Sequence, residues 1–600
     1  MLKVSIVVPV HNAGRYLDLC APSLLDQSIG RDAYEIIYVD DGSTDDSPRR
    51  LDDLAARHPH VRVAHQENSG WPGKPRNVGV RLARGEYVQF VDQDDELTPE
   101  ALQRLHGLAV RNRSDIVLGK VTGTMQGPSS VFKRTVERCT AADAPLFESL
   151  TPHKMFRRRF LLDHGIEFPE GRVRLEDQVF MARAYVRAKT VSILGGHPCY
   201  IWNRRDDGGN TSARATPPEV YYGHLRTVVA AVKEGTDPGP LQDHLLRRSY
   251  RVELLRPVSE PRVLQRTGKA LERYFTVVRR MALDCYPPGV RAGLPAISAL
   301  RAALLEAGRL DSLVELARRT QHIRAHLTID DIRWSEGGSG SGSVGGPAGA
   351  RLLISTTITL LRPDGEPLTL QERDGRLFLD PALLAGIEGA EHWEVPDPLD
   401  HARGELLVHD TARDEWWFPD ADLTPRLEPL ATTGHHRVAV SGVTAVDPRT
   451  LAGGDTLLPG THLVWASAQL LGVGRRVRVT ATTTEHRPHL PTTRLGAPPR
   501  LLIPTWSARD DQLRLAVGPL GHTTTAHRAF LHTTNSPHLR RTARTLIHRL
   551  PPSLRHGARA LARRADPWRP GRGREELPDR RGAEGPGSPR ATLPRHGRTP

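Results

Sequence analysis

The chain has 600 residues, of which 38% are hydrophobic, and a formal net charge of +14 at pH 7. This length predicts three or four domains, each able to bury a core. No apolar run approaches the length that crosses a bilayer, which argues against a transmembrane helix. The positive charge favours a polyanionic partner or an anionic membrane face. Because the usual nucleic-acid-binding sequence patterns are absent, nucleic acid is not an expected partner.

The cysteines and the first residues indicate the compartment. Four cysteines lie far apart, in no metal-ligand spacing, and fit a reducing cytoplasm better than a disulfide framework. Residues 1–10 enter a strand pattern at once and lack the charged, apolar and small-residue order of a secretory signal. A cytoplasmic location is therefore expected.

Strands and helices are predicted to alternate over the first part of the chain. Buried strands are expected at residues 4–10, 34–39, 61–65 and 87–91, with helices at about 16–27 and 48–57. Alternation of this kind predicts an α/β sheet.

Two acidic clusters follow predicted strands, namely Asp40-Asp41 and Asp92-Gln93-Asp94-Asp95. Ligands of open α/β sheets bind beyond the carboxyl ends of the strands, where both clusters are expected. Crowded carboxylates repel one another, and a divalent cation with oxygen ligands relieves that repulsion. The clusters therefore predict a metal site for a phosphorylated ligand. A solvated acidic turn that caps the next helix accounts equally well for 92–95 taken alone.

The segment 67–77 is rich in proline and glycine and predicts a shaped loop, with the next helix starting at Asn77. Lys74 and Arg76 are donors suited to a diphosphate. An ordinary surface loop is the alternative.

The order of these motifs resembles family 2 glycosyltransferases. It runs Val-Ser-Ile-Val-Val-Pro-Val-His-Asn, Val-Asp-Asp-Gly-Ser-Thr-Asp, Pro-Arg-Asn-Val-Gly, Ala-Arg-Gly-Glu-Tyr-Val and Phe-Val-Asp-Gln-Asp-Asp-Glu-Leu, over at least residues 1–110. The resemblance implies a GT-A fold, a nucleotide-diphosphate-sugar donor and a divalent metal. It implies that Asp94 ligates Mn²⁺ or Mg²⁺, with Asp95 behind it. The nucleotide-sugar would be held by Pro9, Asp41, Asn68, Arg76 and Asp92.

Glu176 and Asp177 stand where a helix is expected to begin. Acids there favour the helix dipole, which explains them without any chemistry. The resemblance instead implies that Asp177 is the catalytic base, with Glu176 orienting it or touching the acceptor. One base and one metal-held leaving group imply a single displacement with inversion, giving a β-linkage from an α-linked donor.

Residues 199–212 are glycine-rich, aromatic and basic, and predict a lid over a diphosphate, with Arg204 and Arg205 facing the phosphates. A plain loop that ends the domain is the alternative. Lys154 is either an acceptor-side contact or a surface lysine.

The remaining segments complete the predicted organisation. After a GT-A domain at 1–215, the patterns predict a helical region at 216–335, a flexible linker at 336–350, β-sandwich domains at 351–440 and 441–535, a basic amphipathic helix at 536–565 and a disordered tail at 566–600. The basic helix would bind the acceptor polymer or an anionic leaflet, at the inner face of the cell membrane. A solvated basic tail is the alternative. Trp416-Trp417-Phe418 is either a sugar-stacking platform or core.

This arrangement is similar to that of wall teichoic acid β-N-acetylglucosaminyltransferases. The resemblance implies UDP-GlcNAc as donor, a poly(ribitol phosphate) acceptor and a homo-oligomer, with trimerisation through the β domains. Two other functions stay open: a glycosyltransferase for capsular polysaccharide or exopolysaccharide with another donor, and a non-catalytic carbohydrate-binding scaffold.

Overall fold

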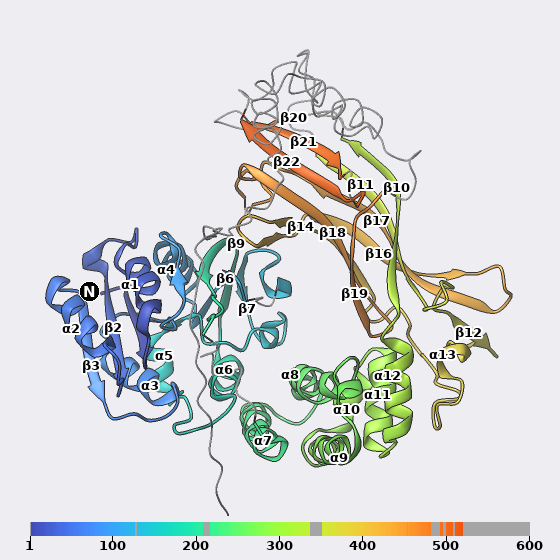
Figure 1. Cartoon of the computed structure of the whole chain (residues 1–600), viewed down its shortest axis with the longest axis horizontal. Coiled ribbons are helices and arrows are strands. Elements are labelled where there is room, and N and C mark those ends of the chain that lie inside the picture. Colours follow the sequence, from blue (N-terminus) through green and yellow to red (C-terminus); the bar gives the residue numbers. More distant parts are fainter. Residues whose placement is uncertain are drawn as a thin grey trace, which may run out of the picture. The chain divides into compact units, whose positions relative to one another are not determined.

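The computed structural model describes residues 2–125, 129–207, 216–335, 351–452, 454–481, 493–495, 500–507 and 510–519 (Figure 1). The predicted linker at 336–350, the predicted basic helix at 536–565 and the tail at 566–600 lie outside the described residues. Among the described helices, none combines the length and apolarity that crossing a bilayer requires.

A nine-stranded sheet forms the N-terminal region (Figure 1). Its strand order is β3-β2-β1-β4-β8-β6-β9-β5, with β7 paired to β9. The strands are β1 (Val4–Val10), β2 (Tyr34–Asp41), β3 (Val61–Gln66), β4 (Tyr87–Phe90), β5 (Glu96–Leu97), β6 (Ile116–Thr122), β7 (Val136–Cys139), β8 (Met155–Arg157) and β9 (Val191–Ile201).

The register brings the ends of three strands to one edge. Strand β1 pairs in parallel with β2, where Val10 faces Asp40, and with β4, where Val7 faces Phe90. Because parallel strands run the same way, the chain leaves β1, β2 and β4 at the same edge of the sheet. The expectation that both acidic clusters lie at one edge is confirmed.

Helices pack on both faces of this sheet, which is why β1 and β2 are apolar almost throughout. Alternate residues of β1 enter two cores: Val7 belongs to a core shared with residues of α3 and α6, and Val8 to a core shared with residues of α1 and α4. The helices of this region are α1 (Leu17–Leu25), α2 (Ser47–Arg57), α3 (Gly73–Leu82), α4 (Ala101–Asn112), α5 (Arg158–Asp163) and α6 (Glu176–Arg187).

Helix α3 begins at Gly73, not at Asn77 as predicted. Pro72 stands at the N-cap position and Pro75 within the first turn, where a missing N–H breaks no intrahelical bond. Arg76 therefore lies in a helix instead of a loop. A Cβ on Gly79 would come within 2.2 Å of a methyl carbon of Val7, so this glycine lets α3 approach β1.

The chain then forms a helical region, as predicted from residue 216. Its elements are α7 (Pro218–Glu234), α8 (Pro240–Ser249), the π-helix η6 (Tyr250–Leu255), α9 (Gly268–Cys285), α10 (Pro288–Ala292), α11 (Ala296–Glu306) and α12 (Leu310–Thr320). The prediction extended helices to residue 335, but Arg324–Trp334 is strand β10, which pairs antiparallel with β11 (Leu352–Leu361). Its apolar residues Leu327 and Ile329 alternate with polar ones, a strand pattern that the prediction overlooked.

Two antiparallel sheets follow, but they are not divided at residue 440. One sheet has the order β10-β11-β17-β12-β13, with β16 on β17, and the other β15-β14-β18-β22-β21-β20, with β19 on β18. Strand β17 (His435–Val446) crosses the predicted boundary, and β14 (Arg403–Asp410) pairs with β18 (Gly460–Leu470). The sheets interleave along the chain, so a split into successive units at 440/441 is wrong. The other strands are β12 (Leu370–Arg373), β13 (Arg376–Leu379), β15 (Glu415–Trp417), β16 (Asp420–Pro429), β19 (Val473–Arg478), β20 (Thr493–Leu495), β21 (Arg500–Trp506) and β22 (Leu513–Pro519).

Candidate active site

A cavity of about 830 Å³ opens where β1, β2 and β4 end. Nine of the residues proposed from the sequence line it: Pro9, Asp41, Asn68, Arg76, Asp92, Asp94, Glu176, Asp177 and Arg205. Arg204 is not among the lining residues; its side chain is exposed and its backbone N–H donates to Thr124 Oγ1 at 2.7 Å. The structure thus brings the predicted residues together, apart from Arg204.

Asp41 fixes the loop that follows β3. Its carboxylate accepts hydrogen bonds from the backbone N–H of Ser69 at 3.1 Å and from the Ser69 hydroxyl at 2.9 Å. Gln66 Nε2 donates to the same carboxylate at 2.5 Å. The next residue, Gly42, has a φ of +67° and leaves no room for a side chain. A Cβ there would lie 2.6 Å from the backbone nitrogen of Asn68. Asp41 and Asn68 are therefore held side by side at the cavity wall.

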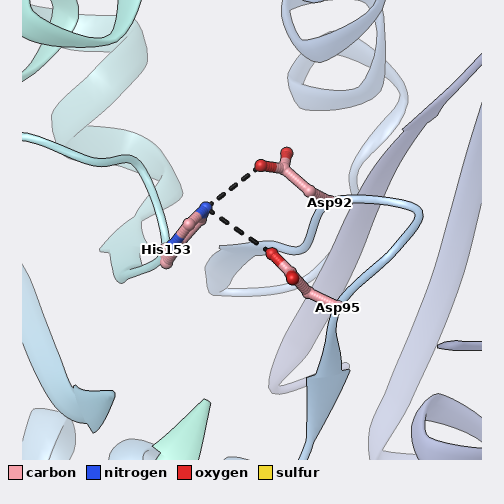
Figure 2. A group of neighbouring side chains, drawn as sticks. All are labelled: Asp92, Asp95 and His153. Carbon is pink, nitrogen blue, oxygen red and sulfur yellow. Dashed lines mark hydrogen bonds and ion pairs between the residues drawn. The ribbon is translucent and has the colours of Figure 1, made fainter. Parts of the chain in front are cut away.

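His153 lies between two acids of the loop after β4 (Figure 2). Its Nε2 is 3.0 Å from Asp92 Oδ2 and 3.9 Å from Asp95 Oδ2, and the three side chains have the spacing of a metal-binding group. These residues already have other partners within the protein, however. The Tyr200 hydroxyl donates to Asp95 Oδ2 at 2.6 Å and accepts from the Asp92 backbone N–H at 3.1 Å. The imidazole of His153 stacks on the Tyr200 ring, with centroids 4.3 Å apart.

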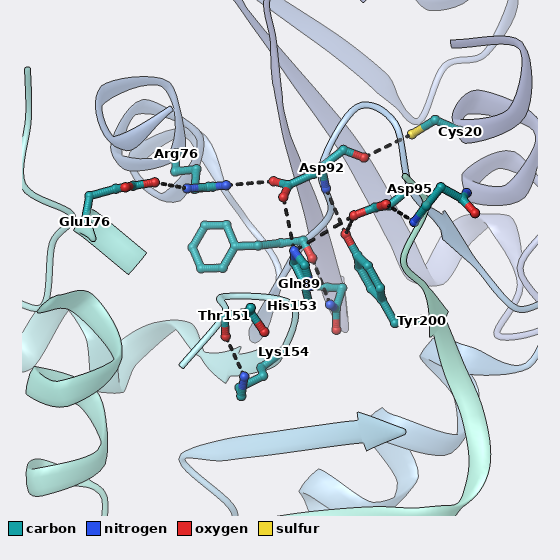
Figure 3. A network of polar contacts seen from close by, with 12 residues as sticks. Cys20, Arg76, Gln89, Asp92, Asp95, Thr151, His153, Lys154, Glu176 and Tyr200 are labelled. Carbon is teal, nitrogen blue, oxygen red and sulfur yellow. Dashed lines mark hydrogen bonds and ion pairs between the residues drawn. The ribbon is translucent and has the colours of Figure 1, made fainter. Parts of the chain in front are cut away.

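A buried guanidinium joins the two predicted halves of the site (Figure 3). Arg76, which is 4% exposed, donates to Asp92 Oδ1 at 2.7 Å and to Glu176 Oε1 at 3.3 Å. Trp71 Nε1 donates to the other oxygen of Glu176 at 2.7 Å. Burial opposes ionisation of Asp92, but Arg76 and then His153 outweigh it and hold the pKa of this carboxyl well below its usual range. Asp92 is thus an anion fixed from two sides.

Asp94 differs from its neighbours because it forms no salt bridge with any described residue. Burial and the negative charge of Asp92 raise the pKa of Asp94 to about 6. Burial and the charges of Asp92 and Asp94 also raise the pKa of Asp95 well above its usual range. Crowded carboxylates with raised pKa values fit a divalent cation, which prefers oxygen ligands and would favour their ionised forms. Of the three acids, Asp94 is the one whose carboxylate lines the cavity without an ion-pair partner among the described residues.

Asp177 lies in the first turn of α6, across the cavity from the acidic loop. Its Oδ1 accepts a hydrogen bond from the backbone N–H of Gln178 at 2.7 Å. Burial, and then the charge of Glu176, raise the pKa of Asp177. A carboxylate with a raised pKa at a cavity wall has the proton affinity that a general base requires.

Arg205 closes the cavity on the side of the segment after β9. Its guanidinium lies over the ring of Tyr16, with the Cζ–centroid distance 4.2 Å, and pairs with Asp207 at 2.7 Å. The Tyr16 hydroxyl donates to Asp206 Oδ1 at 2.7 Å. Residues 205 and 206 of the predicted lid are thus tied to Tyr16, while 208–212 lie outside the described residues.

Several lining residues were not expected from the sequence. His11 and Gln93 pair through the His11 backbone: the N–H of His11 donates to Gln93 Oε1 at 2.8 Å, and Gln93 Nε2 donates back to its carbonyl at 3.1 Å. His11 and Gln93 both lie within motifs that resemble family 2 glycosyltransferases, so the sequence did hold a sign of their place in the site. His153, Arg172, Arg174 and Tyr221 also line the cavity, and no local pattern marked them. Lys154 does not line the cavity; it is buried and donates to the Thr151 carbonyl oxygen (Figure 3).

The aromatic residues 416–418 contact other protein groups. Lys120 Nζ lies 3.1 Å from the centroid of the Trp417 ring and donates to the Trp416 carbonyl at 2.9 Å. The Trp416 ring stacks on His409 at 4.1 Å, with Arg476 4.3 Å from its centroid. Packing within the protein therefore accounts for these rings.

Comparison with known families gives two matches in succession. Residues 5–175 match the profile described as glycosyl transferase family 2. Residues 218–317 match the profile described as the glycosyl transferase TarS linker domain. Together these matches span most strands of the first sheet, most of the cavity lining and most of the helical region, while helix α6 and strand β9 lie between them.

Curated relatives include a poly(ribitol-phosphate) beta-glucosyltransferase of Bacillus spizizenii, 39% identical over 236 residues, which are 39% of this chain and 37% of that protein. The poly(ribitol-phosphate) beta-N-acetylglucosaminyltransferase TarS of Staphylococcus aureus is 34% identical over 39% of this chain and 41% of its own. The matched part thus spans about two fifths of the length of these relatives. The glycosyltransferase GlyG of Streptococcus pneumoniae is 30% identical, with 34% of this chain and 71% of that protein covered.

Among solved structures, that of S. aureus TarS 1-349 in complex with UDP-GlcNAc superposes with a TM-score of 0.51 at 23% identity. The superposition covers 66% of this chain and 100% of the other. It shows a shared fold, and with the family profiles it confirms the GT-A domain followed by a helical region.

Proposed function

Because the chain belongs to glycosyltransferase family 2, we propose that it is a metal-dependent inverting transferase that moves a sugar, GlcNAc, from a UDP-sugar to a hydroxyl of a poly(polyol phosphate) polymer. One observation carries the proposal: Asp94 and Asp177, each a carboxylate with a raised pKa, line the same cavity from different elements. A displacement needs an acceptor for the proton and a charge that stabilises the leaving group, and these two acids suit the two tasks.

The donor half of the site is the edge formed by β1, β2 and the acidic loop. Pro9, Asp41 and Asn68 would contact the nucleoside, and Arg205 would face the diphosphate. Asp94 would hold Mn²⁺ or Mg²⁺. When bound, such an ion neutralises the charge that develops on the departing UDP. Arg76, whose guanidinium pairs with Asp92 and Glu176, orients those acids instead of reaching the phosphates.

The acceptor half centres on Asp177. An acceptor hydroxyl attacks the anomeric carbon, the bond from that carbon to UDP breaks, and the hydroxyl proton passes to an Asp177 oxygen. One displacement inverts the configuration, so an α-linked donor yields a β-linkage. Glu176, held by Trp71 and Arg76, keeps a negative charge beside Asp177, and this charge favours proton uptake.

The polymer proposal rests on the relatives and on charge. The relatives are named for poly(ribitol-phosphate), with a glucosyl group in one and an N-acetylglucosaminyl group in another. Arg172 and Arg174 line the cavity next to Asp177 and would pair with phosphates of such a polymer. A cytoplasmic location is a further proposal, which rests on the four scattered cysteines. Contact with the inner face of the membrane, proposed from the basic segment 536–565, and oligomerisation through the C-terminal sheets, implied by the sequence resemblance, are two others.

A donor screen tests the proposed function directly. Protein with Mn²⁺ is titrated calorimetrically with UDP-GlcNAc, UDP-glucose and other nucleotide sugars, and UDP release is then measured with and without polymer. We expect UDP-GlcNAc to bind and poly(ribitol phosphate) to accelerate UDP release more than poly(glycerol phosphate). If only UDP-glucose binds, the donor is UDP-glucose and not UDP-GlcNAc. If only a polymer without phosphate accelerates UDP release, the polysaccharide alternative is favoured. If no donor binds, the chain is a non-catalytic scaffold.

A further inference from the structure

A side chain from the helical region enters the cavity that holds Asp177. Helix α7 packs beside α6 (Figure 1), and Tyr221, in its first turn, lines the cavity together with Arg174, Asp177 and Gln178. The segment that matches the family 2 profile ends at residue 175, whereas Tyr221 belongs to the next matched segment. The cavity wall around the base is therefore built from both regions.

A buried carboxylate holds Tyr221 in this place. The Tyr221 hydroxyl donates to Glu253 Oε2 at 2.6 Å, and Glu253, on η6, is 8% exposed. The other oxygen, Oε1, accepts from Arg248 at 3.1 Å and from Gln178 Nε2 at 3.3 Å. Arg248 also donates to Gln178 Oε1 at 3.2 Å. Both carboxylate oxygens thus have partners, as a buried charge requires.

The same cluster reaches the base through its neighbour. Gln178 follows Asp177, and its backbone N–H donates to the Asp177 carboxylate at 2.7 Å. The turn before α6 is also attached to α7, because the Arg174 backbone N–H donates to His224 Nδ1 at 3.0 Å. Leu175, between Arg174 and the start of α6, has a φ of +68°. Residues other than glycine rarely adopt this backbone conformation unless their surroundings impose it.

We propose that the helical region completes the acceptor half of the active site, with Tyr221 as an acceptor-positioning side chain that Glu253 holds in the cavity wall. The inference rests on the proposed transferase function. Burial, and then the charge of Glu253, raise the pKa of Tyr221 above its usual range, so its hydroxyl stays protonated at neutral pH. Tyr221 is therefore a contact surface and not a second base.

The decisive experiment separates transfer to the polymer from release of UDP to water. In the full chain, Tyr221→Ala is expected to raise the KM for poly(ribitol phosphate) about tenfold, the effect of one lost contact worth about 1.4 kcal/mol. Donor affinity and UDP release without polymer should stay within about twofold, because the donor half is untouched. Tyr221→Phe keeps the ring but loses the bond to Glu253, so a smaller rise of KM is expected.

A matched control lies in the same helices. The Tyr250 hydroxyl, on the same π-helix as Glu253, donates to Glu306 Oε1 at 2.6 Å, and neither residue lines the cavity, so Tyr250→Phe removes one tyrosine–carboxylate hydrogen bond without touching the cavity. This control should leave every constant unchanged. An unchanged KM and kcat in Tyr221→Ala would overturn the proposal. Equal losses in transfer and in UDP release to water would also overturn it, since they would indicate a general disturbance of α6.

A second measurement does not depend on turnover. In Glu253→Gln, amide hydrogen exchange at residues 176–180 should rise relative to the wild-type chain, because the first turn of α6 loses its charged support. Unchanged exchange there would contradict the role given to Glu253. If the wild-type chain releases UDP but transfers to no polymer, the proposed acceptor is wrong. The exchange result then still decides whether the helical region supports the base.

Discussion

Arg76 Nη2 lies 2.7 Å from Asp92 Oδ1, so a guanidinium from α3 neutralises the first acid of the loop after β4. The same side chain reaches Glu176, and it is almost wholly buried. A charge pair of this kind is costly to break, because removing one partner leaves the other buried and unpaired.

Arg76→Ala should therefore destabilise the N-terminal region by about 3–5 kcal/mol. Urea denaturation of the variant and wild-type chains measures the change. Arg81→Ala on the same helix is the control, since the Arg81–Glu167 pair is exposed and such pairs add little. Similar midpoints for the Arg76 and Arg81 variants would show that the buried pair contributes no stability.

Asp177→Asn should abolish transfer while leaving donor binding nearly unchanged. The amide cannot take a proton, and general-base catalysis contributes roughly 10²–10⁴-fold. Steady-state transfer rates and calorimetric titration with the UDP-sugar check the two parts. Asp177→Glu, which keeps a carboxylate at a displaced position, should retain measurable transfer. Transfer that survives in Asp177→Asn would assign the base elsewhere.

The pH dependence of transfer should follow Asp177, whose pKa burial and Glu176 raise to about 7. Below that pH the carboxyl carries a proton and cannot accept another, so kcat rises with pH and levels off above about 7. The charge of Lys154 should shift the rising limb of this pH profile to lower pH. Burial lowers its pKa to about 7, while its charge interacts favourably with ionised Asp177. Lys154→Met should therefore move the limb to higher pH, and a shift to lower pH would contradict this interaction.

Asp94→Ala should weaken metal-dependent donor binding by at least about tenfold, the scale of losses at metal sites. Calorimetry with UDP-sugar in Mn²⁺ and in excess EDTA makes the comparison. The wild-type chain should lose affinity in EDTA, and the variant should change little between the two conditions. Asp163→Ala on α5, a surface acid paired with Arg159, serves as the control. An EDTA effect that persists in Asp94→Ala would place the ion elsewhere, for example at Asp92, Asp95 and His153.

The sequence was most informative where the functional side chains lie at the end of a predicted strand or directly after it. Asp41, Asp92 and Asp94 could be placed at one edge because parallel strands share a direction, and the registers of β1 with β2 and β4 agree. It was less informative where two neighbours in sequence diverge: Arg204 is exposed and Arg205 lines the cavity, a difference that depends on how one loop turns.

Residues brought in by tertiary packing could not be predicted. His153 stacks on a tyrosine of β9, and Tyr221 arrives on a helix whose sequence shows only ordinary amphipathic spacing. Helix α3 begins four residues before the predicted start because prolines, which favour a loop in a sequence pattern, are tolerated in the first turn of a helix. The interleaving of the C-terminal sheets depends on pairings between distant segments, such as β14 with β18, which no local pattern encodes.

The short strand β5 has a consequence for how the acidic loop can change. Glu96 and Leu97 pair with Ile201 and Tyr200 of β9, while Phe90 is paired with β1, so the loop is anchored at both ends. A substitution at Gln93 would remove its two hydrogen bonds to the His11 backbone, but an inserted residue would displace Asp94 or break one of the anchors. Apart from its three acids, the loop should therefore accept a changed side chain more readily than a changed length.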